Sequence, residues 1–130
     1  MSHVSRNELD SKTKHQIINT FELVLGKMDK DEANTFFYSI LSDTERVMLA
    51  KRLAIALLLK EGIDESAIAR ALNVTRETVD RINLVLLKRP QGYELAIKKI
   101  NEDKMMQELK KTLVKLASYS IKAAGGRVDF

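Results

Sequence analysis

The sequence predicts an all-α protein, and three observations support that fold class. Pro90 is the only proline among the 130 residues, and glycine occurs five times, so residues that break helices are rare. No segment alternates between apolar and polar residues with the period of two that is typical of strands. A chain of this length forms one domain with its own core, to which a further helix can be appended.

The amino-acid composition excludes several classes of protein. Without cysteine, neither a disulfide framework nor a thiolate metal site can form. The polar N-terminus lacks an apolar run, and the most apolar stretch, Val47 to Leu59, is too short for a bilayer and contains Lys51 and Arg52. We therefore expect a cytoplasmic protein without membrane contact. The net charge of +4 is compatible with a nucleic-acid partner but does not require one.

Residues 1–41 are expected to form two helices that serve core and dimer packing. The first runs from about Asn7 to Met28 and has one apolar face. Asp29 caps the second helix, whose acidic first turn suits the helix dipole. The apolar side of this second helix consists of Phe36, Phe37, Ile40 and Leu41.

The third helix, about residues 43–61, begins at Ser42, with Glu45 in capping-box register. Nearly all its residues from Val47 to Leu59 are apolar. A helix that is apolar on nearly every side must be covered on nearly every side. A chain this small rarely does that alone, so this helix predicts burial against a second subunit.

Residues 65–84 have the pattern of a helix-turn-helix. Ala69 is small where two steep helices meet, and Asn73 tolerates the positive φ that the turn needs. Asp64 and Thr75 can cap the two helices. Five apolar residues fill the angle between the helices: Ile68, Leu72, Val74, Val79 and Ile82. Such a unit usually places its second helix in the DNA major groove, although structural bundles and protein-binding domains also contain similar hairpins.

The segment after Pro90 continues the helical pattern. One helix is expected from Gly92 to about residue 100, which ends the helix-turn-helix core at 42–100. Residues 101–130 form a C-terminal helix and a loose tail from Gly125, with a coiled-coil-like repeat of Met106, Leu109, Leu113 and Leu116. Packing on its own subunit and a partner-binding or DNA-contacting role both remain open for this helix.

The candidate DNA contacts lie on and beside the second helix of the helix-turn-helix. The residues expected to face the bases are Thr75, Arg76, Glu77, Asp80 and Arg81. Those expected to hold phosphates are Ser66, Arg70, Lys88 and Arg89. The two acids should weaken non-specific binding. In the alternative interpretation, Arg76–Asp80 and Glu77–Arg81 are ordinary i,i+4 ion pairs on a solvated helix.

From Leu41 to about Ile100 the chain resembles the Trp repressor superfamily. The matching residues are Leu-Ser-Asp-Thr-Glu-Arg at 41–46, Lys-Arg-Leu at 51–53 and Thr-Val-Asp-Arg at 78–81. The chain looks closest to the YerC/YecD-type members, because an aromatic-rich helix precedes the core and Tyr93 to Ala96 follows it. The resemblance implies a repressor-like transcriptional regulator. It also implies that this regulator is an intertwined homodimer that binds palindromic double-stranded DNA.

The resemblance also implies a candidate effector pocket at Ser42, Arg52 and Arg81. Members that bind tryptophan have glycine after the second arginine, whereas this chain has Ile82. Because a branched side chain would crowd an indole ring, tryptophan is not the expected effector, and another small molecule or none remains open. Arg52 is also explained as an arginine that extends from a mostly buried helix into solvent.

Enzymatic activity is not expected. His3 and His15 lie in the N-terminal segment without a neighbouring metal-ligand partner, and no glycine-rich phosphate loop exists. The main hypothesis is therefore a dimeric DNA-binding regulator without a cofactor. The alternative is a helical protein-interaction module that keeps the helix-turn-helix shape without binding DNA.

Overall fold

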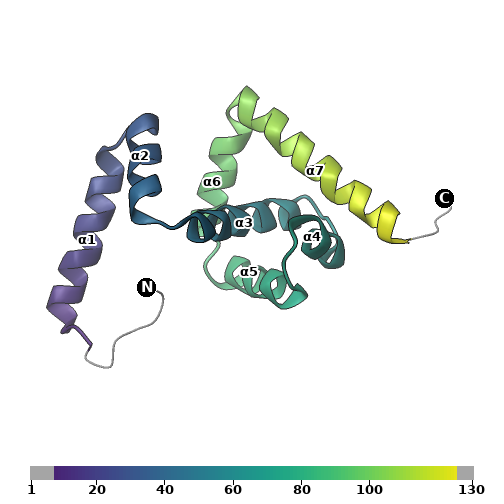
Figure 1. Cartoon of the computed structure of the whole chain (residues 1–130). Coiled ribbons are helices and arrows are strands. Elements are labelled where there is room, and N and C mark those ends of the chain that lie inside the picture. The colour runs from purple at the N-terminus through teal and green to yellow at the C-terminus, as the bar shows by residue number, and fades with distance from the viewer. Residues whose placement is uncertain (1–7, 126–130) are drawn as a thin grey trace. The chain divides into compact units, whose positions relative to one another are not determined.

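The computed structural model describes residues 8–125, with side chains up to residue 119, and this part of the chain is all-α (Figure 1). The helices are α1 (Ser11–Lys27), α2 (Lys30–Ile40), α3 (Asp43–Lys60), α4 (Glu65–Leu72), α5 (Arg76–Lys88), α6 (Gln91–Asn101) and α7 (Lys104–Gly125). The predicted fold class is confirmed. The expected first-helix start at Asn7 and nearly all of the expected tail lie outside the described residues, and Gly125 itself ends α7.

The chain forms two compact units, residues 1–46 and residues 47–130. The N-terminal unit contains α1, α2 and the first turn of α3, and the C-terminal unit contains the rest of α3 and the helices after it. Each unit is described separately below. In the part of the chain that the structure describes, no helix is long and apolar enough to cross a membrane.

The N-terminal unit has well-formed helix ends. Asp10 accepts a hydrogen bond from the Thr13 N–H, which caps α1 and lowers the pKa of the Asp10 carboxyl. At the start of α2, Asp29 and Glu32 form a complete capping box, so the predicted cap at Asp29 is confirmed. The Phe21 and Phe36 rings are in tilted contact, 6.0 Å apart.

No residue of α1 or α2 is buried within one chain. Several of the apolar residues expected on the packed face of α1 stay substantially exposed, with Ile17 at 53% and Phe21 at 41%. The other large apolar side chains exposed on these two helices are Ile18, Leu23, Val24, Tyr38 and Ile40. Helices α1 and α2 therefore leave apolar surface that they do not cover themselves.

Helix α3 begins as predicted and then divides into two halves. The Ser42 and Glu45 side chains accept from each other's backbone N–H, which completes the capping box. Val47, Met48 and Leu49 are exposed, whereas the stretch from Ile55 to Leu58 is buried. Within one chain, therefore, only the second half of α3 is covered, and the burial of this helix against a second subunit stays a prediction. Gly62, with φ of +81°, follows the end of this helix.

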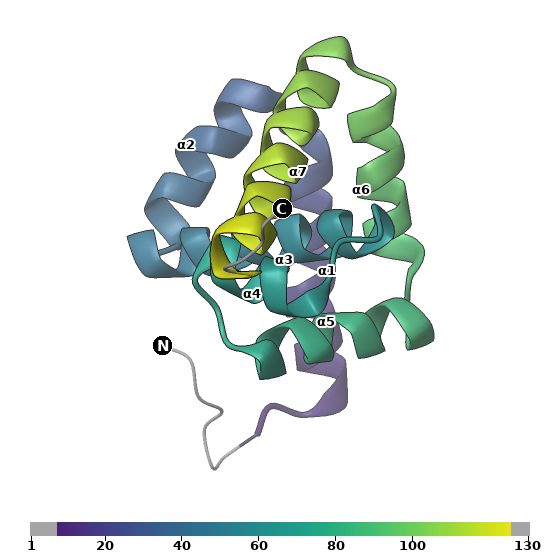
Figure 2. The same cartoon turned by 90° about the vertical axis from the view of Figure 1, so that its right-hand side faces the viewer.

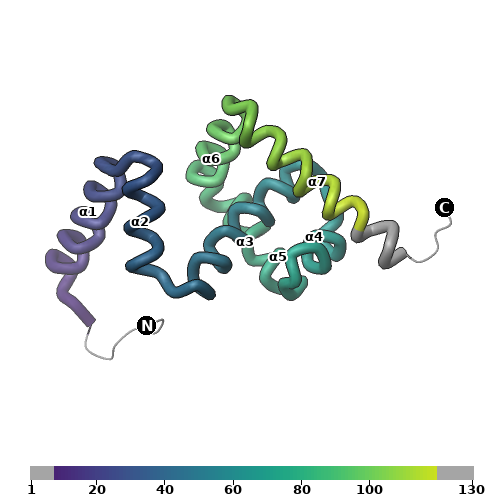
Figure 3. The backbone as a smooth tube through the Cα atoms, turned by 45° about the horizontal axis from the view of Figure 1, so that its top comes forward, coloured from purple at the N-terminus to yellow at the C-terminus, as the bar shows by residue number. Residues whose placement is uncertain are grey.

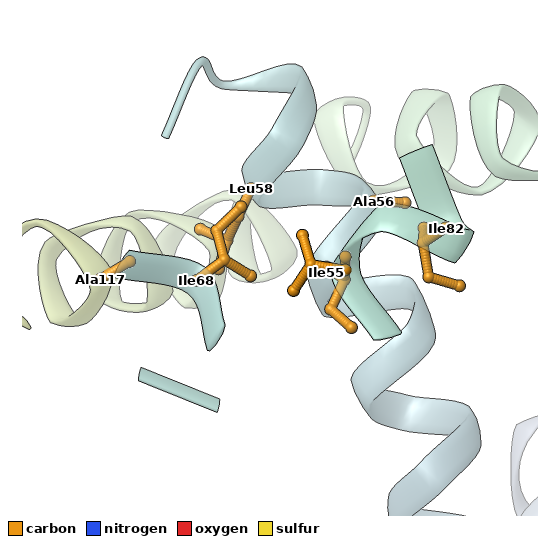
Figure 4. Packing of buried hydrophobic residues seen from close by; sticks show 7 residues of the cluster. Ile55, Ala56, Leu58, Ile68, Ile82 and Ala117 are labelled. Carbon is orange, nitrogen blue, oxygen red and sulfur yellow. The ribbon is translucent and has the colours of Figure 1, made fainter. Parts of the chain in front are cut away.

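The core of the C-terminal unit joins four helices (Figure 4). It consists of Ile55, Ala56 and Leu58 from α3, Ile68 from α4, Val79 and Ile82 from α5, and Ala117 from α7. Figure 2 shows α6 and α7 next to each other near the turn that joins them, and Figure 3 shows α7 running from there toward α4, which it contacts.

Helix α7 packs on its own subunit through one face. Ala117 is fully buried, Leu113 packs against the core, and Lys110 Nζ lies 3.3 Å from a Glu61 carboxylate oxygen. Met106, Leu109 and Leu116, which share the predicted repeat with Leu113, remain exposed. Helix α7 therefore supports α4 from outside the helix-turn-helix.

Candidate nucleic-acid interface

The two helices α4 and α5 are joined by a turn with the predicted backbone geometry. Asn73 is in the left-handed region with φ of 55°, and it alone among the described non-glycine residues has a positive φ. Its N–H donates to backbone carbonyls at the end of α4, and the Val74 N–H donates to the Ala69 carbonyl at 2.9 Å. The turn is therefore fixed by main-chain hydrogen bonds and by the tolerance of asparagine for this conformation.

Both predicted caps are present. Asp64 accepts from the Ser66 N–H at 3.0 Å and begins α4. Thr75 Oγ1 accepts from the Thr78 N–H at 3.1 Å, and its hydroxyl also lies 2.9 Å from the Thr78 hydroxyl. Because each cap satisfies an N–H that lacks a partner within the helix, the start of each helix is set locally.

The apolar residues predicted between the helices do pack together. Ile68 and Val79 are fully buried, Ile82 is 6% exposed, and Leu72 and Val74 pack at the edge of this cluster. Ala69, predicted at the closest approach of the helices, is half-buried. The fully buried small residue of α4 is instead Ala67, which the sequence pattern did not single out.

The outer face of α5 is polar and exposed. All five residues predicted to face bases lie on it or at its start: Thr75, Arg76, Glu77, Asp80 and Arg81. Arg81 Nη2 lies 3.1 Å from a Glu77 carboxylate oxygen, as the i,i+4 spacing predicts, and both side chains are mostly exposed. This ion pair is therefore weak and open to competition from an outside partner.

The predicted pairing of Arg76 with Asp80 is wrong, because Arg76 pairs with α4 instead. Its Nη2 lies 3.2 Å from Glu65 Oε1, and its Nη1 donates to Ser66 Oγ at 3.1 Å. Asn83 Nδ2 donates to the other Glu65 oxygen at 3.3 Å. Glu65 is thus held in place by two residues of α5, which gives Arg76 a better ordered partner than an exposed aspartate one turn away.

The residues predicted to hold phosphates fall into two groups at opposite ends of α5. Ser66 and Arg70 line a hollow of about 360 Å³ beside the start of the helix, together with Arg76. Lys88 and Arg89 lie at the other end and are exposed. This separation suits contacts to two different phosphates rather than to one.

Two of the three residues predicted for an effector pocket meet in one cavity of the C-terminal unit. Arg52 and Arg81 line a cavity of about 680 Å³ with Ile82 and Tyr93. Its lining also includes Lys51 and Arg89 and contains no carboxylate, so the cavity favours an anionic group. The third, Ser42, caps α3 and belongs to the N-terminal unit.

Residues that could hold a metal do not gather in the described part of the chain. Between residues 8 and 125, no three His, Cys, Asp or Glu side chains form a group suited to a metal ion. His15 lies on the exposed surface of α1, and His3 lies outside the described residues.

The chain matches the model of a known protein family. The family model described as Trp repressor protein matches residues 15–101, which is more than half of the chain and includes α2 to α6 in full. Helix α7 lies outside this match. Searches of curated proteins and of solved structures gave no significant match.

Proposed function

Because the chain belongs to the Trp repressor protein family, we propose that it is a sequence-specific DNA-binding transcriptional regulator that acts as a repressor-like homodimer. The observation that carries this proposal is the α4–α5 unit, which combines a left-handed turn at Asn73, a closed apolar interior and a polar outer face on α5. This geometry suits the insertion of α5 into a DNA major groove. The aromatic-rich α2 and the Tyr93–Ala96 segment support a YerC/YecD-type member.

The proposed homodimer rests on apolar surface that one chain leaves uncovered. Helices α1 and α2 bury no residue, and the first half of α3 exposes Val47, Met48 and Leu49. Exposed apolar side chains in such number on these helices are typical of an interaction site. A two-fold dimer would place two α5 helices on half-sites about 34–36 Å apart, which predicts a palindromic operator.

In this proposal the exposed face of α5 reads bases. Arg81 can pair bidentately with guanine once Glu77 releases it, and Asp80 can accept from a cytosine amino group. Lys88 and Arg89 hold backbone phosphates at the far end of the helix. The two acids limit non-specific binding, so the ratio of specific to non-specific affinity should be high.

Selection of binding sites from random duplex DNA, at near-physiological salt, tests the function. We expect the wild-type protein to enrich a palindrome. Arg81→Ala should relax the preference at one symmetric pair of positions, because a bidentate pair gives about 1–3 kcal/mol of discrimination. Lys111→Ala on α7 is the matched control, since it also removes one exposed cation from an ion pair with a carboxylate. Failure of the wild type to enrich any sequence would contradict the proposal.

A protein-interaction module is the second candidate, and the acids on α5 favour it. Glu77 and Asp80 make the outer face of this helix mixed in charge rather than uniformly basic. Salt dependence separates the two functions, because each neutralised phosphate steepens the fall of log K with log salt by about 0.9. A partner bound with a shallow salt dependence, and no retention of duplex DNA, would favour the protein-interaction module.

The cavity lined by Arg52 and Arg81 is the proposed effector site, and we infer that tryptophan is not its ligand. Ile82 is buried in the core and lines the cavity, and it stands where the tryptophan-binding members that this chain resembles have glycine, so its branched side chain would crowd an indole ring. Calorimetric titration with tryptophan should give no saturable heat. Saturable binding that Arg52→Ala abolishes would contradict this inference.

A further inference from the structure

Three polar residues from α4 and α5 gather at a hollow on the helix-turn-helix. Ser66, Arg70 and Arg76 line this hollow of about 360 Å³, and the rest of its lining is Ala69, Asn73 and Val74. Two guanidinium groups and one hydroxyl therefore face a space that has no carboxylate in its lining. The hollow also lies beside the first residue of α5, where the helix dipole favours a negative charge.

One arginine of this hollow, Arg76, already forms an ion pair with a carboxylate of the protein. Arg76 donates from Nη1 to Ser66 Oγ at 3.1 Å and from Nη2 to Glu65 Oε1 at 3.2 Å. The Glu65 carboxylate does not line the hollow, and Asn83 holds its second oxygen at 3.3 Å. The guanidinium thus lies between an internal carboxylate and an open space that suits an external anion.

This arrangement differs from that of Arg81. Arg81 pairs with Glu77 on its own helix, and both side chains point into solvent at more than 70% exposure. Arg76 is instead tied to α4, so its guanidinium is directed along the junction of the two helices and not freely outward from α5. An arginine tied to the first helix in this way is suited to the DNA backbone, because the first helix of a helix-turn-helix crosses the backbone while the second lies in the major groove.

We propose that Ser66, Arg70 and Arg76 form a binding site for one DNA backbone phosphate, and that Glu65 is a built-in competitor which the phosphate displaces from Arg76. The inference rests on the proposed DNA-binding function and reassigns Arg76 from the bases to the backbone. Guanidinium groups match the geometry of phosphate oxygens, and two arginines can share one phosphate. Glu65 then sets the strength of binding without affecting which sequence is bound.

Two arginine variants separate a phosphate contact from a base contact. Binding is measured by fluorescence anisotropy with the selected palindrome and with a scrambled duplex of the same composition, over a series of KCl concentrations. Arg76→Ala should weaken binding to both duplexes by the same factor and should reduce the slope of log K against log salt by about 0.9. Arg81→Ala should weaken binding mainly to the palindrome.

Glu65→Gln tests the competitor. Glutamine keeps an oxygen that can accept from Asn83 but removes the charge that holds Arg76. Glu94→Gln is the matched control, because it removes one carboxylate from a partly exposed pair with Lys60, 3.6 Å apart. Relative to this control, Glu65→Gln should tighten binding to both duplexes by about twofold to fivefold, which corresponds to the loss of a surface ion pair. Circular dichroism melting of each variant verifies that the fold is retained.

The outcomes are distinguishable. A wild-type protein that bound no duplex DNA would overturn the proposed function and this inference together. If the wild type bound, two results would each overturn the inference alone. In the first, Arg76→Ala would lose affinity only for the palindrome and keep the wild-type salt slope. In the second, Glu65→Gln and Glu94→Gln would bind duplex DNA with equal affinity. Equal loss on both duplexes together with tighter binding of Glu65→Gln would establish the phosphate site.

Discussion

The N-terminal and C-terminal units begin their helices by the same means but differ in what those helices bury. In both units, side chains such as Asp29 and Thr75 cap the free N–H groups at helix starts. The C-terminal unit then closes a core in which Ile55, Leu58, Ile68 and Val79 are fully buried. Helices α1 and α2 bury no residue at all. Caps therefore define where a helix starts, whereas stability depends on apolar partners that only one unit finds within a single chain.

The largest effect is expected in the core of the C-terminal unit. Leu58→Ala leaves a cavity among side chains from several helices, so it should lower the free energy of unfolding by about 2–5 kcal/mol. Because this core lies within one chain, the loss should not depend on protein concentration. Thermal unfolding at two protein concentrations measures both quantities, and a loss that changed with concentration would show that a second chain supports this core.

A smaller effect that depends on concentration is expected in the N-terminal unit. Ile17 is about half exposed in one chain, so we expect its side chain to stabilise the dimer when a second chain covers it. Ile17→Ala should weaken dimerisation by about 1–2 kcal/mol in total for the two copies, or about fivefold to thirtyfold in dissociation constant, as measured by sedimentation equilibrium. Leu87→Ala, which truncates a more exposed residue of α5, is the control. Equal dissociation constants for the two variants would remove α1 from the proposed interface.

The same contrast explains how much of the fold the sequence could predict. The caps at Asp29, Ser42, Asp64 and Thr75 and the left-handed turn at Asn73 were all predicted, because each depends on residues within a few positions along the chain. The apolar set between α4 and α5 was predicted for the same reason, since helical periodicity defines which side of a helix is apolar.

Contacts between distant residues could not be predicted in this way. The partner of Arg76 is Glu65, and this pairing depends on the angle at which α4 and α5 cross. The burial of Ala117 against the core likewise depends on where α7 lies, and periodicity left two roles open for that helix. The i,i+4 spacing favoured Asp80, which lies one turn from Arg76 on the same helix but is exposed to solvent. Glu65 comes from the other helix, and a hydrogen bond from Asn83 already holds its carboxylate in place.

The smallest expected effect concerns pH, and it too distinguishes the two units. The Ser42 backbone N–H donates to Glu45, and this bond lowers the pKa of the Glu45 carboxyl; the Thr13 N–H lowers the pKa of Asp10 in the same way. Both carboxyls lie in the N-terminal unit. A carboxyl whose pKa is lower in the folded state stabilises the fold above its ordinary pKa and loses that contribution as the pH falls through the folded value.

Glu45→Gln keeps an oxygen that can accept from the Ser42 N–H but removes the titrating proton. The stability of the wild type should therefore fall more than that of Glu45→Gln when the pH drops from about 5 to below the ordinary carboxyl pKa near 4. Chemical denaturation at a series of pH values measures the difference. Since this hydrogen bond is exposed to solvent, the effect is screened and should be small. Parallel acid profiles for the two proteins would mean that the start of α3 does not contribute to acid sensitivity, and Asp10→Asn would then show whether the start of α1 does.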